Sequence, residues 1–440
     1  MTVPTGIEAD VAPLLETRQE ALQCPHRYFA TLRDVGPVVW LEGVGAYAVT
    51  TYDETMEVLR DPGTFSSLLA TGPTMAAQTL GVLQEVMAEH PDLQARMADS
   101  PMVQHTSVLL NADPPAHDRQ RALVNRAFSP RRVRQMEEPI AGIAHDLVDR
   151  FAGRGRCEFV REFAVALPLT VIAGALGVPG DDLPTFKRWS DDFVVAIGNH
   201  RLGKDSLRRM IESQFEFFDY FTEKIRERQA RPEDDLITDV VEARIDGTEP
   251  LSVPEMLMML SQFLVAGNET TAKLLASAML RLARDPRMAQ EVRGAPDAVA
   301  GFAEEALRLD APVQGLFRMV MRDVTLAGQK IAAGSHLWLL YASANRDPAE
   351  FAEPDDVVLA RENGKAHLSF GQGTHYCLGA SLARAEARIG ISTVLERLDG
   401  IRLADDAIEY EESYVLHGLK ELHLEFEART GGLEAVERTC

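Results

Sequence analysis

Residues 370–379 read Phe370-Gly371-Gln372-Gly373-Thr374-His375-Tyr376-Cys377-Leu378-Gly379 and place one cysteine on a glycine-rich turn, just before a helical run. Gly371 and Gly373 let the backbone bend and approach a flat ligand closely. We expect a helix over Ala380–Leu395, which would place the Cys377 sulfur near a helix N-terminus. The helix dipole and the free N–H groups favour negative charge there. The loop therefore predicts a cysteine presented as a thiolate ligand.

Two other interpretations of this cysteine were weighed. A lone cysteine is often a small buried hydrophobic residue. A zinc site is disfavoured, because the four cysteines lie far apart in the sequence and no Cys-x-x-Cys or His-x-x-x-His pattern accompanies them.

The loop follows the pattern Phe-Gly-x-Gly-x-His-x-Cys-x-Gly and resembles the haem-ligand loop of the cytochrome P450 monooxygenases, soluble bacterial type. The resemblance extends from about Pro25 to Phe426. It implies a mainly α fold with small β-sheets, in which a single large domain surrounds one buried haem b (iron protoporphyrin IX). It also implies that Cys377 is the axial ligand of the haem iron.

The composition is typical of a globular protein, with 440 residues, 46% of them hydrophobic and 25% charged. No Pro/Gly/Ser-rich linker or charge block divides the chain, so we expect one domain over residues 1–427 and a flexible tail over 428–440. The net charge of −22 argues against a nucleic-acid partner, because the nucleic-acid backbone is also negative.

The sequence predicts neither a membrane anchor nor secretion. Met1–Pro13 carries acidic residues and lacks an apolar run, unlike a signal peptide. Phe163–Gly180 is uncharged, but Pro168 and Pro179 interrupt it, which favours a helix in the core over a membrane span. Scattered cysteines without a disulfide framework are typical of a reducing compartment, so we expect a cytoplasmic protein.

Most of the chain has a helical pattern, with β structure in two places. Val38–Trp40 and Ala46–Thr50 predict a hairpin, and Met319–Tyr341 predicts a second extended region. Ser252 and Glu255 form a capping-box pattern at the start of a helix that runs to about Arg284. That helix would be about 48 Å long, enough to cross the domain.

The middle of the long helix reads Ala266-Gly267-Asn268-Glu269-Thr270-Thr271. A glycine there costs about 1 kcal/mol relative to alanine, so we expect a close-packing reason for Gly267. The Thr270 hydroxyl can bond back to a carbonyl one turn earlier and loosen the helix. A packing glycine beside a surface acid would also explain the pattern. The segment resembles the family's oxygen-activation segment, which implies that Thr270 and Glu269 deliver protons, with Glu in place of the more frequent Asp.

Glu305 and Arg308 lie three residues apart on one predicted helix face. Most such pairs are solvated and contribute little to stability. Here the spacing resembles the family's Glu-x-x-Arg, which implies a buried structural charge cluster with a third member, for which Arg361 is our candidate.

His117 and Arg121 occupy positions i and i+4 of a helix that Asp113–Arg121 is expected to begin. They resemble the family pair that holds the haem propionates, and Arg318 and His375 are implied as the other propionate contacts. The full set implied to bind the cofactor is His117, Arg121, Ala266, Arg318, Phe370, His375, Cys377 and Gly379.

The resemblance implies a haem-thiolate monooxygenase that hydroxylates an apolar small molecule with O₂. Electrons would come from NAD(P)H through ferredoxin reductase and ferredoxin, since no flavin or iron–sulfur motif is present. A peroxide-driven peroxygenase and a non-catalytic haem-thiolate sensor remain as alternatives. The residues implied to contact substrate are Leu264, Val265, Val313, Leu316 and Leu416, and their apolar character does not select one substrate.

Two further segments carry expectations. Phe65–Asp113 holds Leu80, Leu83 and Met87 at helical spacing, with further methionines around them, and is expected to be a mobile lid. Arg119–Arg134 contains six arginines and no acid, and the resemblance implies that it is a helix that borders the cysteine side of the haem. We expect Arg126, Arg131, Arg132 or Arg134 to help dock an acidic ferredoxin, unless these arginines pair with nearby acids such as Glu137 and Glu138.

Overall fold

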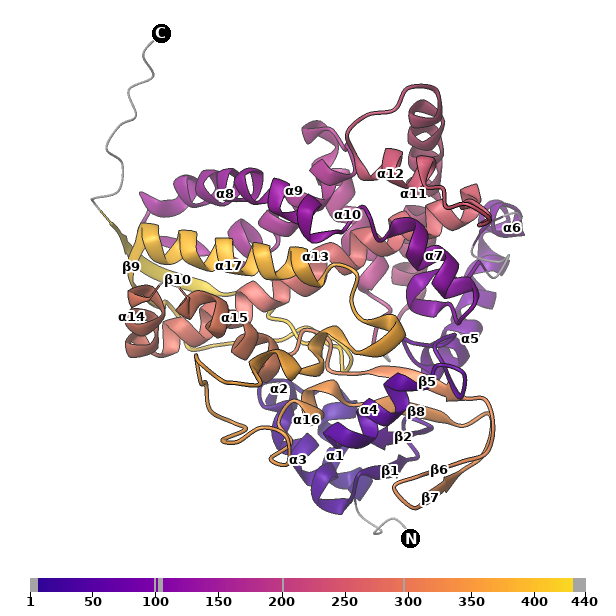
Figure 1. Cartoon of the computed structure of the whole chain (residues 1–440), viewed down its shortest axis with the longest axis horizontal. Coiled ribbons are helices and arrows are strands. Elements are labelled where there is room, and N and C mark those ends of the chain that lie inside the picture. Colours follow the sequence, from indigo (N-terminus) through magenta and orange to yellow (C-terminus); the bar gives the residue numbers. More distant parts are fainter. Residues whose placement is uncertain (1–6, 99, 102–105, 200–201, 296, 430–440) are drawn as a thin grey trace.

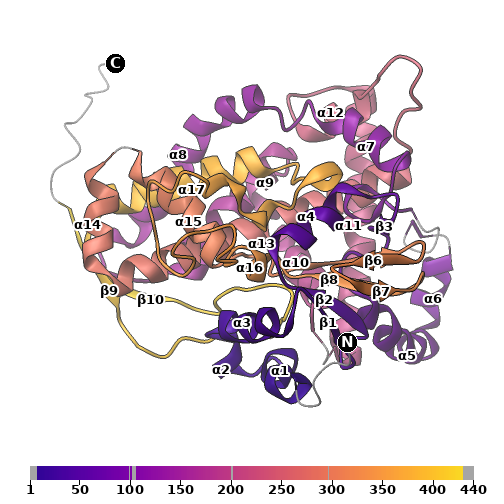
Figure 2. The ribbon, with the colours of Figure 1, turned by 60° about the horizontal axis from the view of Figure 1, so that its bottom comes forward.

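The computed structural model describes residues 7–98, 100–101, 106–199, 202–295 and 297–429. Long helices form most of the molecule, and a sheet lies at one side with the N-terminal helices (Figures 1 and 2). The helices are α1 Ile7–Leu15, α2 Gln19–Leu22, α3 Pro25–Val35, α4 Tyr52–Arg60, α5 Pro73–Glu89, α6 Pro91–Ala98, α7 Ala116–Val124, α8 Pro130–Ala152, α9 Ala166–Ala175, α10 Leu183–Val194, α11 Lys204–Ala230, α12 Leu236–Glu242, α13 Val253–Arg284, α14 Pro286–Gly294, α15 Ala298–Leu309, α16 Tyr341–Ala344 and α17 Ala380–Arg397. The strands are β1 Val38–Leu41, β2 Ala46–Val49, β3 Phe65–Ser66, β4 Arg156–Glu158, β5 Leu316–Val320, β6 Val324–Leu326, β7 Gln329–Ile331, β8 His336–Leu339, β9 Leu398–Leu403 and β10 His423–Ala428.

The largest sheet has the strand order β1-β2-β8-β5-β3. β1 and β2 pair antiparallel, with Val38 opposite Val49, so the predicted hairpin is confirmed. The second extended region is also confirmed, although it begins earlier, at Leu316, because β5 pairs antiparallel with β8 over Leu316–Met319. Two smaller sheets, β4-β10-β9 and β6-β7, complete the β structure.

The long central helix α13 begins where the sequence predicted. The Ser252 side chain accepts from the Glu255 N–H, and the Glu255 carboxylate accepts from the Ser252 N–H, which closes the capping box. α13 spans 32 residues and packs against α9, α15 and α17. Nearly every residue in the second half of α13 is buried, so the polar side chains of that half lie in the core.

Four expected boundaries differ from the structure. Phe163–Gly180 is not one helix: Phe163 lies in a π-helical turn over Val160–Ala164, and α9 then runs from Ala166 to Ala175. Arg119–Arg134 is divided between α7 and α8 by a turn. The helix after the cysteine loop continues two residues further than expected, to Arg397. Ala428, expected in the tail, belongs to β10 and pairs with Leu398, while residues 430–440 lie outside the described residues. Among the described helices, none is long and apolar enough to cross a membrane.

Candidate active site

The cysteine loop folds as a tight turn against the start of α17. The Cys377 N–H donates to the Phe370 carbonyl at 2.9 Å, which closes the loop on itself. Burial raises the pKa of the Cys377 thiol, while N–H groups of Gly379 and Ala380 and the charges of Arg121 and Arg384 act in the opposite direction. The sulfur therefore lies among donors and cations that would stabilise a thiolate once a metal ion binds it.

Two glycines shape this loop for different reasons. Gly373 has φ of 70°, and a Cβ there would lie 2.6 Å from the Leu59 carbonyl oxygen, so the position excludes any side chain. Gly379 has no neighbouring atom within 4 Å of where its Cβ would lie. The first glycine thus allows close packing on α4, and the second leaves open space beside Cys377.

Residues from three other segments, which are α7, β5 and the turn after β3, converge on His375 of this loop. The rings of His117 and His375 lie 4.3 Å apart, centroid to centroid. Burial, followed by the charges of Arg318, His117 and Arg121, lowers the pKa of His375 to about 3. His375 also exchanges a hydrogen bond with the Ser67 hydroxyl at 3.0 Å. The structure therefore gathers the four residues that were expected to hold propionates.

The two arginines of this cluster bond to neutral groups, whereas His117 contacts the Asp118 carboxylate at 3.2 Å. Arg318 is buried, and its guanidinium donates to the Phe317 carbonyl at 2.7 Å. Arg121 donates to the neutral side chain of Asn125 at 2.9 Å. Two guanidinium groups with neutral partners and two imidazoles suit a pair of carboxylates. The donor set thus matches the two propionates of haem.

Small side chains in the middle of α13 leave part of the helix surface accessible. Ala266 is exposed and Val265 half-buried, although the surrounding helix is buried. The Thr270 hydroxyl donates to the Ala266 carbonyl at 2.9 Å, as its sequence predicts. Gly267 lacks the tight contact we expected, because a Cβ there would meet Ile172 at an ordinary 3.5 Å.

Leu264 corrects another expectation. It is fully buried within a core cluster that includes Ile172 and Leu260, rather than lining the same space as Ala266. Two residues along a helix correspond to about 200° of rotation, so Leu264 and Ala266 face nearly opposite directions. The sequence could not show which face of α13 is turned toward the ligand, because α13 is apolar on several faces. Leu264 is therefore a packing residue and not a substrate contact.

Three of the other residues expected to contact substrate, Val313, Leu316 and Leu416, belong to one hydrophobic cluster. Val313 and Leu416 form an antiparallel β-bridge although they are far apart in the chain. Leu316 begins β5 and is partly buried, and Leu416 is buried. This wall joins the segment after α15 to the C-terminal loop.

Glu269 has a partner that the sequence pattern did not reveal. Its Oε2 accepts from Lys273 Nζ at 2.9 Å, and the same Nζ donates to Glu411 Oε2 at 2.7 Å. Glu269 and Lys273 are both buried. Glu-x-x-x-Lys on a helix usually indicates a solvated pair, so only the fold could place this one in the core.

The Glu-x-x-Arg residues form a buried ion pair with Arg361. Arg308 is fully buried and binds Glu305 through two bonds, at 2.7 and 2.8 Å, and Arg361 Nε donates to Glu305 Oε1 at 3.1 Å. Burial acts to raise the pKa of Glu305, but bonds from Arg308 and the Val358 N–H outweigh it and hold that pKa below its ordinary value. The contact between Arg361 and Glu305 is the one that the sequence comparison implied.

A second charge cluster was missed by sequence reasoning. Glu304 accepts from Arg384 at 2.6 and 3.0 Å and exchanges a hydrogen bond with His367 at 3.0 Å. Arg384 also donates to the Tyr376 hydroxyl at 3.0 Å and lies over the Phe370 ring. Arg384 therefore ties α15 and α17 to the cysteine loop.

Comparison with known proteins agrees with this geometry. A family model described as cytochrome P450 matches residues 200–413. Cytochrome P450 107B1 from Saccharopolyspora erythraea is 33% identical over 420 residues, covering 94% of this chain and 98% of the relative. A steroid C26-monooxygenase from Mycobacterium tuberculosis is 37% identical over 302 residues, covering 68% of this chain and 80% of the relative. CYP109E1 from Bacillus megaterium, solved in complex with corticosterone, has a TM-score of 0.79 and 32% identity, covering 92% of this chain and 99% of that chain.

The mainly α fold and the thiolate-presenting loop define a haem-thiolate enzyme. This chain belongs to the cytochrome P450 family. It is accordingly a cytochrome P450 monooxygenase whose cofactor is haem b.

Proposed function

We propose that this enzyme hydroxylates an apolar small molecule with the help of a haem that the Cys377 thiolate would hold. The observation that carries the proposal is the juxtaposition of Cys377, at the donor-rich start of α17, with the cluster of His117, Arg121, Arg318 and His375. Those four side chains would hold the propionates, and Ala266, Phe370 and Gly379 would lie along the macrocycle. When bound, the haem-thiolate activates O₂, so that one oxygen atom enters the substrate and the other becomes water.

The reaction consumes two electrons and two protons for each O₂. We assign proton delivery to Glu269 and Thr270, which are consecutive on α13 and border the exposed Ala266. The Thr270 hydroxyl, bonded back to the Ala266 carbonyl, can pass a proton at a position where the helix groove is open. Glu269 is the nearest acid in sequence to that hydroxyl and can resupply it.

Among apolar substrates, a steroid-sized molecule is favoured. One relative is a steroid C26-monooxygenase and one structural neighbour was solved with corticosterone. Val265, Val313, Leu316 and Leu416 supply apolar surface, which binds a rigid hydrocarbon skeleton by removing it from water. Fatty acids, terpenoids and aromatic compounds complete the panel that should be tested.

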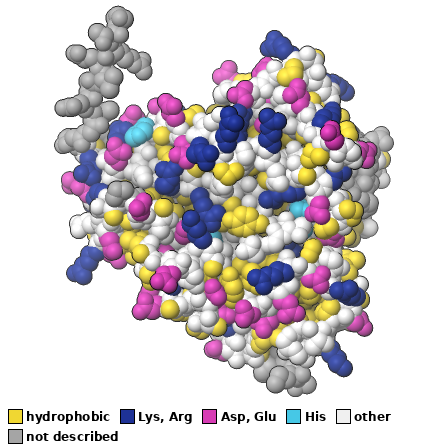
Figure 3. Space-filling view, viewed as in Figure 1, with side chains coloured by type: hydrophobic (Ala, Val, Ile, Leu, Met, Phe, Trp, Pro, Cys, Tyr) yellow, Lys and Arg dark blue, Asp and Glu magenta, His cyan; other side chains and the backbone are white. Residues whose placement is uncertain are grey.

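We further propose that electrons arrive from NAD(P)H through ferredoxin reductase and a ferredoxin in the cytoplasm. The three described cysteines are free, as in a reducing compartment. Lys and Arg side chains are spread over the face that carries α7, α8 and α17 (Figure 3). Arg126, which precedes α8, and Arg131 and Arg134 of α8 are exposed, although the chain is acidic as a whole.

The ion pairs refine the docking surface. Arg132 pairs with Asp234 at 2.7 Å and Arg119 pairs with Glu255, so neither is a free cation. Glu137 pairs with Arg388 at 2.8 Å rather than with the arginines of α8. The docking proposal therefore rests on Arg126, Arg131 and Arg134, and Arg132 is withdrawn from it.

The experiment that tests this function combines substrate binding with turnover. The haem-loaded enzyme is titrated with a panel of steroids, fatty acids, terpenoids and aromatics, and each binder is then incubated with NADH, ferredoxin reductase and ferredoxin. Product formation that depends on all three supports the proposal. Product formed only with hydrogen peroxide would indicate a peroxygenase, and binding without any product would indicate a sensor.

Docking is tested separately by the rate of the first electron transfer against ionic strength. In an Arg131→Glu, Arg134→Glu double variant the rate at low salt should fall by about tenfold, because exposed charges steer association and salt screens them. Arg132→Gln serves as the control, because that arginine is already paired with Asp234. Equal rates and equal salt slopes for wild type and the double variant would contradict the docking surface.

A further inference from the structure

Lys273 is a buried cation that the reaction described above does not yet use. It lies one turn after Glu269 on α13, is 4% exposed, and bonds to two carboxylates, Glu269 at 2.9 Å and Glu411 at 2.7 Å. Burial acts to lower the pKa of Lys273, but the two carboxylates outweigh it and raise that pKa above its ordinary value. Lys273 therefore remains charged, and its ammonium bridges Glu269 on α13 and Glu411 in the C-terminal loop.

The C-terminal loop is shaped around this lysine. A Cβ at Gly418 would lie 2.6 Å from Lys273 Cγ, so only glycine allows the loop to cross the lysine stem. The Glu411 N–H donates to the Gly418 carbonyl at 2.9 Å, which holds the carboxylate of Glu411 over the lysine. Leu416, a candidate substrate contact, lies in the same loop. Lys273 is thus fixed from both ends, by its stem and by its ammonium.

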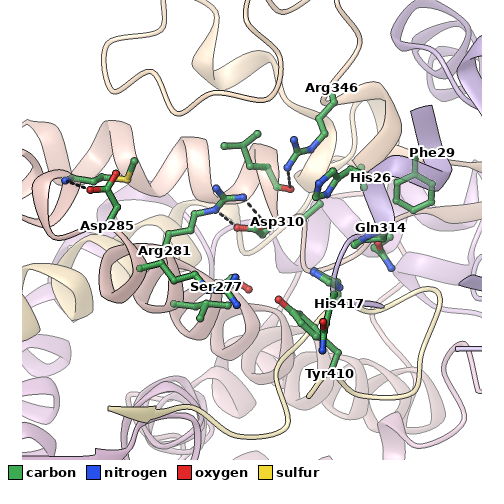
Figure 4. A pocket seen from close by; sticks show the side chains of 18 residues that line it. His26, Phe29, Ser277, Arg281, Asp285, Asp310, Gln314, Arg346, Tyr410 and His417 are labelled. Atoms are coloured by element: carbon green, nitrogen blue, oxygen red, sulfur yellow. Dashed lines mark hydrogen bonds and ion pairs between the residues drawn. The ribbon is translucent and has the colours of Figure 1, made fainter. Parts of the chain in front are cut away.

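A polar cavity of about 300 Å³ begins one helical turn beyond Lys273 (Figure 4). Ser277 and Arg281, which follow Lys273 at intervals of four on α13, line it together with Tyr410 and His417 of the C-terminal loop. The rings of Tyr410 and His417 stack at 4.5 Å, centroid to centroid. His417 is buried and its Nδ1 has no hydrogen-bond partner. The surroundings of α13 on the C-terminal side of Lys273 are therefore polar, while Thr270 lies on its N-terminal side, toward the proposed haem site.

The physical consequence concerns Glu269. The Lys273 ammonium binds Glu269 Oε2 at 2.9 Å in a charge-assisted hydrogen bond and restricts the rotation of that side chain. This bond occupies Oε2 and leaves Oε1 for another contact. Glu411, 40% exposed, connects this arrangement to solvent.

We propose that Lys273 is a positioning residue for proton delivery, which fixes the Glu269 side chain through its bond to Oε2 so that the carboxylate can serve Thr270, while Glu411 anchors the lysine from the C-terminal loop. This inference rests on the proton-delivery role proposed above for Glu269 and Thr270. Lys273 itself does not transfer a proton. Each proton enters from water, binds the carboxylate of Glu269 and passes to the Thr270 hydroxyl, so that Glu269 returns to its ionised form.

The test uses haem-loaded Lys273→Met, Lys273→Arg and Glu411→Gln enzymes with a substrate found in the binding panel. Product formed per NADH should fall by about tenfold in Lys273→Met, with the missing electrons recovered as hydrogen peroxide. Lys273→Arg should recover most of the coupling, since it retains the charge. Glu411→Gln, which leaves Lys273 and Glu269 in place, should lose about twofold. Lys420→Met removes an exposed lysine of the same loop that pairs with Glu409 and Glu412, and should be unchanged.

A second readout does not depend on turnover. Infrared difference spectra between each enzyme and its Glu269→Gln counterpart isolate the bands of the Glu269 carboxyl group. Lys273→Arg should keep the wild-type band positions, and Lys273→Met should shift them, because the ammonium bonded to Oε2 is lost. Unshifted bands in Lys273→Met would contradict the positioning role. If Lys273→Met does not fold, Glu411→Gln decides the question through its coupling ratio, and an unchanged ratio there overturns the proposal.

Failure of this inference is distinguishable from failure of the proposed function. If Lys273→Met couples like wild type while Thr270→Ala and Glu269→Gln do not, the positioning role is wrong and the proton-delivery role stands. If all three variants couple like wild type, the proton-delivery role itself is wrong. If Lys273→Met and Lys273→Arg uncouple equally, the lysine acts through packing, which also overturns the proposal.

Discussion

At the scale of single residues, the chemistry depends on one sulfur atom and one hydroxyl. Cys377 combines backbone donors at a helix start with the nearby guanidinium groups of Arg121 and Arg384. Cys24 and Cys157 lack this setting: Cys24 contacts His26, and burial raises the pKa of Cys157 to about 12. The position of Cys377 in the fold, and not the chemistry of cysteine alone, therefore distinguishes it from the other two cysteines as the residue suited to bind the haem iron.

Cys377→Ala is expected to abolish the red-shifted Soret band of the reduced carbon monoxide complex, because that band requires a thiolate ligand. The measurement is an absorbance difference spectrum of the reduced enzyme with and without carbon monoxide. Cys24→Ala, which also alters a partly buried cysteine, should retain the band. Retention of the band by Cys377→Ala would show that another group is the ligand.

Thr270→Ala is expected to separate electron consumption from product formation. NADH and O₂ should still be consumed, but product per NADH should fall by about tenfold or more because a proton donor is lost. Thr170→Ala is a matched control, since the Thr170 hydroxyl makes the same type of bond to a carbonyl one turn earlier, on α9, at 2.7 Å. Equal product ratios in Thr270→Ala and wild type would remove Thr270 from the mechanism.

At the scale of elements, α13 and α17 meet through a buried carboxyl group. Glu386 of α17 is fully buried and shares a hydrogen bond with the Thr271 side chain of α13. Burial raises the pKa of Glu386 from its ordinary value of 4.5 to about 8. The folded protein therefore keeps this group protonated over a pH range in which the unfolded chain ionises it.

This shift predicts a pH-dependent contribution to stability. Below about pH 4.5 Glu386 is neutral in both states, and as pH rises toward 8 only the unfolded state gains from ionisation, so stability falls. Glu386→Gln mimics the neutral group and should remove that loss, which is roughly 2–4 kcal/mol at pH 8. Melting temperatures of the variant and wild type should be similar at pH 5 and higher for the variant at pH 8.5. Glu396→Gln, exposed on the same helix, is the control, and a variant that melts below wild type at pH 8.5 would contradict the shift.

The elements also show what sequence could and could not predict. The start of α13 followed from Ser252 and Glu255, because capping is a local property. The cysteine loop and the Glu305–Arg308 pair were recognisable because their spacing is short. Lys273 was missed because its burial depends on Gly418 and Glu411, far away in the chain. Leu264 was misassigned because an apolar run does not indicate which face of a helix meets a ligand.

At the scale of the whole molecule, the segment expected to be a lid is divided by its contacts. Phe65–Ser66 is a strand of the main sheet, whereas α5 and α6 lie together at one edge of the molecule (Figures 1 and 2). The side chain of Met102, part of the expected methionine surface, lies outside the described residues. The whole range from Phe65 to Asp113 is therefore not one unit, and the lid prediction applies to α5 and α6.

α5 and α6 pack on the N-terminal half of α11 through a small hydrophobic cluster of their own. Val86 and Leu93 contact Leu207, Ile211 and Phe215 in a cluster separate from the larger cores. Ion pairs repeat the same connection, from Lys204 to Glu85 and Glu89 and from Arg96 to Asp219. A region with its own small core can open without disrupting the rest of the protein.

We therefore expect α5, α6 and residues 204–215 of α11 to move together when a substrate enters. Hydrogen exchange in all three should slow in parallel on addition of a tight-binding ligand, because closure protects the backbone of the whole unit. Exchange in the second half of α13, buried in the main core, is the internal reference and should not change. Slowing confined to α5 and α6 would mean that they close over a fixed α11. Equal exchange with and without ligand would mean that the unit is packed permanently, since its own cluster and ion pairs then hold it closed in both states.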